Sequence, residues 1–67
     1  MNFELNENHV RTAVDRVGGP TKASNLLGVS NNTINSWINN RYIPNIDYAR
    51  RLADLSEMTV QELRETK

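Results

Sequence analysis

The chain has 67 residues, no cysteine, eight acidic and eight basic side chains, and a formal net charge of zero. A chain of this length builds one small core worth only a few kcal/mol, which argues against two lobes enclosing a catalytic cleft. The absence of cysteine excludes a disulfide framework, a thiolate nucleophile and a zinc finger. From its length and composition together, we expect one domain over residues 1–67 with no enzymatic activity, no cofactor and no metal site.

The first predicted helix begins after Asn6, whose side chain can cap it, while Glu7 lies in the positively polarised first turn. One apolar stripe follows at steps of three and four residues: Val10, Ala13, Val14 and Val17. Gly18 and Gly19 end this helix, because glycine readily takes the left-handed backbone conformation found at helix C-termini.

A second, short helix starts at Pro20, since a proline in the first turn has no N–H to leave unsatisfied. Its expected buried side chains are Ala23, Leu26 and Leu27, and it ends at Gly28. Ser30 can cap a third helix by accepting a hydrogen bond from a free backbone N–H. The apolar face of this third helix is Ile34, Trp37 and Ile38; Asn39 or Asn40 ends it, and Pro44 prevents continuation.

A fourth helix is expected after Asn45, with Asp47 at its positive end. Its buried candidates are Ala49, Leu52, Ala53 and Leu55. Thr59-Val-Gln-Glu62 is a capping box that opens a short fifth helix containing Leu63. The sequence therefore predicts an all-α, compact five-helix bundle without strands or repeats.

The segment from Pro20 to about Asn39 has the spacing of a helix-turn-helix. Gly28 lies where the chain must reverse with a positive φ, and Val29 can fill the gap between the two helices. Ile34 and Trp37 are placed to pack on Leu26 and Leu27. These are packing constraints, so an ordinary corner between two helices remains the alternative.

The outer face of the third helix is composed of small polar residues: Asn31, Asn32, Asn35, Ser36 and Asn39. Asparagine is a mediocre helix former, so a helix selected for stability would carry other residues there. Its amide both donates and accepts, and it pairs with the N6/N7 edge of adenine in the major groove. The pattern favours a helix that reads bases over the alternative of a chance polar surface.

Charge is distributed unevenly along the chain despite the net value of zero. No carboxylate occurs from Arg16 to Ile46, whereas Arg16, Lys22 and Arg41 are present. A surface without acidic groups does not repel phosphates, although chance segregation remains an alternative. Met1 to Asn8 lack the apolar stretch of a signal peptide, and no run approaches the roughly 20 apolar residues that span a bilayer, so we expect a cytoplasmic protein with no membrane partner.

Three motifs of the chain belong together: Val29-Ser30-Asn-Asn-Thr-Ile34-Asn-Ser-Trp37, Arg41-x-Ile43-Pro44 and Ala49-Arg50-Arg51-Leu52. In these motifs the chain resembles the Cro-type helix-turn-helix repressors of bacteriophages and prophages, including the YdaS-like branch. The resemblance covers roughly Val10 to Arg64. It implies a lambda-repressor-like DNA-binding fold and a transcriptional repressor, in a bacterial host cell, that binds palindromic double-stranded operator DNA, usually as a dimer.

The resemblance also implies two sets of DNA contacts. Base-reading side chains would be Asn31, Asn32, Asn35 and Ser36; phosphate-contacting residues would be Thr21, Lys22, Asn39, Asn40 and Arg41. Ser24 stands where the motif usually has alanine, and the reading helix has no Arg, Lys or Gln. We therefore expect few base contacts, centred on adenine or on thymine methyl groups, and no bidentate contact to guanine.

Apolar residues beyond the obvious core have two interpretations. They form either a weak homodimer interface or additional core packing: Phe3, Tyr48, Leu55, Met58 and Val60. The alternative function is a protein-interaction module, antitoxin-like or an anti-repressor, that keeps the fold without specific DNA binding. The neutral net charge and the lack of Arg or Lys on the reading helix are its best support.

Overall fold

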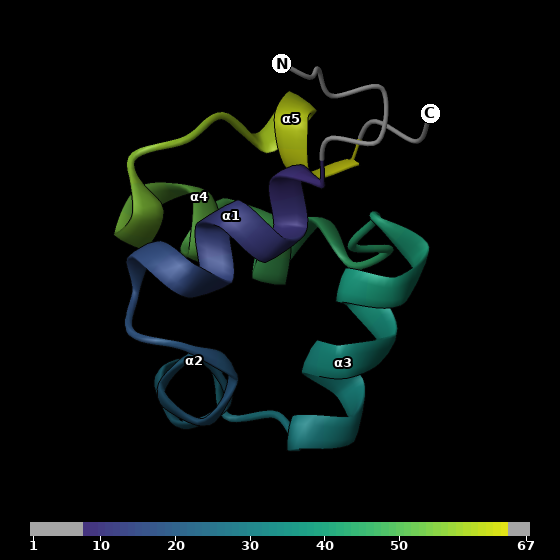
Figure 1. Ribbon diagram of the computed structural model, residues 1–67. Helices are drawn as coiled ribbons and strands as arrows, with labels where there is room; N and C mark the ends of the chain where they lie inside the picture. Colours follow the sequence, from purple (N-terminus) through teal and green to yellow (C-terminus); the bar gives the residue numbers. More distant parts are fainter. Residues whose placement is uncertain (1–7, 65–67) are drawn as a thin grey trace, which may run out of the picture.

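The computed structural model describes residues 8–64, which form five helices and no strand (Figure 1). The helices are α1 His9–Arg16, α2 Pro20–Leu27, α3 Asn31–Asn40, α4 Ile46–Ser56 and α5 Val60–Arg64. The all-α, five-helix architecture predicted from the sequence is confirmed. None of these helices is long and apolar enough to cross a membrane.

Side chains cap the helix N-termini largely as predicted. The Ser30 hydroxyl accepts from the Thr33 N–H at 3.2 Å, and the Asn45 side chain accepts from the Asp47 N–H at 2.8 Å. Thr59 and Glu62 form the reciprocal capping box of α5. At α1 the prediction is corrected: the cap is Asn8, whereas the predicted pair Asn6 and Glu7 lies outside the described residues.

The C-termini of α2, α3 and α4 use left-handed residues, and only one of these three residues is glycine. Gly28 has φ 73°, as expected, and both its own N–H and that of Val29 donate to the Ser24 carbonyl. Arg41 (φ 57°) and Glu57 (φ 61°) take the same conformation at the ends of α3 and α4. These two were not anticipated, because nothing in a single arginine or glutamate indicates a positive φ.

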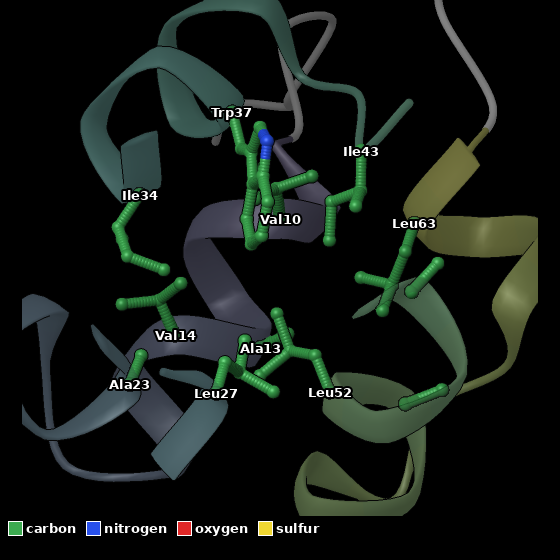
Figure 2. Packing of buried hydrophobic residues seen from close by; sticks show 12 residues of the cluster. Val10, Ala13, Val14, Ala23, Leu27, Ile34, Trp37, Ile43, Leu52 and Leu63 are labelled. Atoms are coloured by element: carbon green, nitrogen blue, oxygen red, sulfur yellow. The ribbon is translucent and has the colours of Figure 1, made fainter. Parts of the chain in front are cut away.

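All five helices contribute side chains to one apolar core (Figure 2). Trp37 and Ile34 of α3 point toward Val10 and Val14 of α1, as Figure 2 shows. The Trp37 ring also lies against Tyr48, with centroids 5.6 Å apart. The fully buried side chains of largest volume are Ile34, Ile43, Leu52, Leu63, Val10 and Val14. Because these core contacts hold the inner face of α3 against the other helices, the opposite face of α3 points away from them.

Three apolar residues are placed differently from the prediction. Leu26 and Leu55, expected in the core, are 40% and 48% exposed. Each lies at the flank of its helix, beside an inward stripe that is formed in α2 by Ala23, Ser24 and Leu27 and in α4 by Ala49, Leu52, Ala53 and Ser56. Ile43, which helical periodicity could not assign because it lies in a loop, is fully buried, and its N–H donates to the Leu63 carbonyl at 3.1 Å.

Candidate nucleic-acid interface

The two helices of the predicted motif cross steeply at the Gly28–Ser30 turn. In Figure 1, α2 is seen along its axis while α3 runs along the side of the molecule, and α1, α4 and α5 lie above α2. Ile34 and Trp37 of α3 are buried, and Ile38 is partly buried against the core. The remaining surface of α3 therefore faces away from the bundle.

Four polar residues follow one another along that outward surface. They are spaced at i, i+3, i+4 and i+7, which places them on one helical face, and all are exposed: Asn32, Asn35, Ser36 and Asn39. We call this set the outward strip. Three of the four residues predicted to read bases thus lie together, opposite the buried Ile34–Trp37 side.

Asn31, the fourth predicted base-reading residue, lies at the first position of α3 beside α2. Its amide nitrogen donates to the Thr21 hydroxyl across a long hydrogen bond of 3.4 Å. The structure therefore brings one predicted base-reading residue next to one predicted phosphate-contacting residue. The Asn31 carboxamide oxygen has no partner among residues 8–64 and keeps its capacity to accept.

The start of α2 differs from the other helix N-termini whose caps the structure describes. Its N-cap, Gly19, makes no side-chain cap hydrogen bond, and Pro20 has no N–H. The N–H groups of a helix first turn, here at Thr21 and Lys22, lack intrahelical acceptors and favour anions. Both side chains are exposed. The Lys22 stem runs beside Gly18, where an added Cβ would lie 3.3 Å from Lys22 Cγ, so this glycine leaves space for the lysine.

The remaining predicted phosphate contacts lie at the opposite end of α3. Asn39 and Asn40 are exposed, and Arg41 is half-buried directly after them. The ten residues of α3 span about 15 Å. A major groove is about 12 Å wide, so the two ends of α3 lie far enough apart to meet the phosphate backbones that border one groove.

The acid-free segment of the sequence corresponds to α1's last residue, all of α2 and α3, and the loops that follow them. Arg16 is engaged in the fold, because its guanidinium donates to the Ser56 carbonyl at 3.0 Å. Within residues 8–64, the side chains of Lys22 and Arg41 have no polar partner. Two of the three cations in the segment therefore remain for an external anion.

Two polar residues that sequence reasoning missed hold the end of α3. Asn8 donates to the Ile38 carbonyl at 2.7 Å. Arg64 donates to the carbonyls of Ile43 and Pro44 and, at 3.0 Å, to the Tyr42 hydroxyl. Their partners lie 20 to 30 residues away in the chain, so no local pattern could have revealed them.

Comparison with known proteins agrees with this geometry. A family model described as Helix-turn-helix matches residues 21–63, which run from the first turn of α2 through α3 to α5. No curated protein and no solved structure gives a significant match. Because the match covers more than half of the chain and includes the α2–turn–α3 unit, the chain belongs to the helix-turn-helix family of DNA-binding transcription regulators.

Proposed function

We propose that the protein is a Cro-type repressor of a phage or prophage, which acts in the bacterial cytoplasm by occupying a double-stranded operator and excluding RNA polymerase. One observation carries the proposal: α3 presents four exposed polar side chains on one face, with hydrogen-bond donors and a cationic side chain near each of its ends. The motifs shared with Cro-type regulators support the finer assignment to a phage or prophage.

Base reading is assigned to Asn32, Asn35 and Ser36, together with Asn31 at the start of the helix. Asparagine amides pair with adenine edges, whereas a bidentate contact to guanine requires Arg or Lys. Neither occurs on α3. The proposed operator therefore has adenine or thymine at the positions that α3 contacts.

Phosphate binding is assigned to both ends of α3. At one end, the exposed first turn of α2 offers the Thr21 hydroxyl, the Lys22 ammonium and uncapped backbone N–H groups. At the other end are Asn39, Asn40 and Arg41. Such contacts set the register of a protein on the duplex without reading sequence.

The first experiment separates base reading from phosphate binding. Duplexes are selected from a random pool with the wild-type protein, and affinities are then measured across a range of salt concentrations. Asn32→Ala should lose about 1–3 kcal/mol on the selected duplex and relax the preference at one position. Lys22→Ala should weaken all duplexes alike and reduce the salt slope by about 1. If the wild type does not prefer a selected duplex over random DNA at low salt, the protein-interaction module replaces this proposal.

Arg41 has a matched control in Glu57. Both residues are left-handed helix ends with similar dihedral angles, so replacement by glycine relieves the same backbone strain at each. Arg41→Gly should reduce affinity for every duplex and lower the salt slope by about 1, whereas Glu57→Gly should leave the slope unchanged. Equal slopes in wild type and Arg41→Gly would remove Arg41 from the phosphate contacts.

We further propose a weak homodimer on a palindromic operator, with the two reading helices about 34 Å apart. Of the residues suggested for its interface, Tyr48, Met58 and Val60 pack against the protein's own core, and Phe3 lies outside the described residues. Leu55 stays exposed and, with Leu26, lines a shallow groove. A strict monomer in sedimentation, both free and on selected DNA, would exclude the dimer.

A further inference from the structure

Asn8 lies where the start of α1 meets the end of α3, and its side-chain amide bonds to both helices. The oxygen accepts from the Arg11 N–H at 3.0 Å and so caps α1. The nitrogen donates to the Ile38 carbonyl at 2.7 Å, which is the shortest side-chain contact made to α3 within residues 8–64. One half-buried side chain therefore connects the start of α1 to a residue of α3 that lies 30 positions further along the chain.

The Ile38 carbonyl is a sensitive point of the reading helix. It belongs to the last turn of α3, directly before Asn39 of the outward strip, and it also accepts from the Arg41 N–H at 3.2 Å. Asn8 itself is held by α1, because its carbonyl accepts from the Thr12 N–H at 3.1 Å. Asn8 therefore fixes the position of the Ile38 carbonyl, and of the last turn of α3, relative to α1.

Apolar packing alone leaves one motion of α3 weakly opposed. Ile34 and Trp37 hold the helix against the core, but the hydrophobic effect is non-directional and permits small rotations that keep these side chains buried. A hydrogen bond is directional and opposes such rotations. Bidentate base contacts, in turn, depend on the orientation of each amide on the outward strip.

We infer that Asn8 is a positioning residue for base recognition: its hydrogen bond to Ile38 fixes the orientation of the outward strip without contacting DNA. The inference rests on the proposed function of α3. It assigns to Asn8 an effect on base preference, separate from its effect on the stability of α1. Phosphate contacts from α2 do not depend on it.

The test uses variants that separate the two bonds of Asn8. Asn8→Ser retains an oxygen that can cap α1, keeps the charge unchanged and is too short to reach Ile38, whereas Asn8→Ala loses both bonds. Thr59→Ala serves as control, because it removes a cap at α5 that makes no contact with α3. All proteins are compared well below their unfolding temperatures.

Asn8→Ser should weaken binding to the selected duplex by about three- to tenfold, which corresponds to one net hydrogen bond. Its affinity for random duplexes should fall by a smaller factor, because the non-specific phosphate contacts assigned to the first turn of α2 do not depend on Asn8. Thr59→Ala should lose stability and keep the wild-type preference. Wild-type preference in Asn8→Ser, or an equal loss on selected and random duplexes, would overturn the inference.

A second measurement does not need DNA. Hydrogen exchange at the Arg41 and Tyr42 amides, which close the last turn of α3, should be faster in Asn8→Ser than in wild type and Thr59→Ala. Unchanged exchange there would overturn the inference by itself. If instead the wild type selects no duplex, the proposed function fails, and that result is distinguishable because it does not involve Asn8.

Discussion

Three helix ends in this protein take nearly the same left-handed conformation with different residues. The dihedral angles φ and ψ are 73° and 33° at Gly28, 57° and 36° at Arg41, and 61° and 40° at Glu57. Glycine adopts this conformation without the steric conflict that a Cβ creates. We therefore predict that Gly28→Ala destabilises the protein and that Glu57→Gly stabilises it.

The magnitude follows from two opposing effects. The left-handed conformation costs a residue with a Cβ about 1–2 kcal/mol, whereas exchanging glycine for alanine reduces the entropy of the unfolded chain and offsets about 0.4–1 kcal/mol. A Cβ at Gly28 would meet no atom within 4 Å, so no clash adds to the backbone effect. Gly28→Ala should therefore lose about 1 kcal/mol, and Glu57→Gly, at an exposed side chain, should gain a similar amount.

The assay is thermal unfolding followed by circular dichroism, with urea unfolding as a check that the m-value is unchanged. For a domain of this size, about 1 kcal/mol shifts Tm by about 4–8 °C, downward for Gly28→Ala and upward for Glu57→Gly. Gly28→Asn is the control and should lose less than Gly28→Ala, because asparagine tolerates this conformation better than alanine does. The reasoning is refuted if Glu57→Gly lowers Tm or if Gly28→Ala leaves it unchanged.

Three further predictions concern stability. Ser24→Ala should raise the free energy of unfolding by about 0.5 kcal/mol, because the buried hydroxyl donates only to the Thr21 carbonyl of its own helix and alanine is the better helix former. A lower free energy of unfolding in urea would contradict this prediction. Ile43→Ala should lower the free energy of unfolding by about 2–5 kcal/mol, whereas Ile46→Ala, at a side chain 44% exposed, should change it by less than about 1 kcal/mol. Similar losses in the two variants would contradict the expected contribution of Ile43 burial. The Thr59 N–H donates to the Glu62 carboxylate and lowers the pKa of Glu62 from its ordinary value of 4.5. A carboxylate with a lowered folded-state pKa stabilises the protein above its unfolded-state pKa and loses that contribution as the pH falls through the folded-state pKa. Stability should therefore fall on acidification below about pH 4.5, and less steeply in Glu62→Gln, as measured by urea unfolding at several pH values.

Local chemistry made most of the helices predictable from the sequence. Ser30, Asn45 and the Thr59–Glu62 pair cap their helices through bonds that span two or three residues, so the residue types alone indicate them. Gly28 is equally local, because glycine has no Cβ and adopts a positive φ without steric cost. The inward stripe of α3 and its outward polar strip follow from helical periodicity in the same way.

Tertiary packing decided what periodicity leaves open. A flank position belongs to core or surface according to what lies across from it, and so Leu26 and Leu55 are exposed while the loop residue Ile43 is buried. The bonds from Asn8 to Ile38 and from Arg64 to the loop after α3 join residues 20 to 30 positions apart. Such partners meet only when the helices are packed. The sequence alone thus determined that α3 exists and which face it turns outward, whereas only the tertiary structure decided how its end is held, because that depends on groups brought together by the other helices.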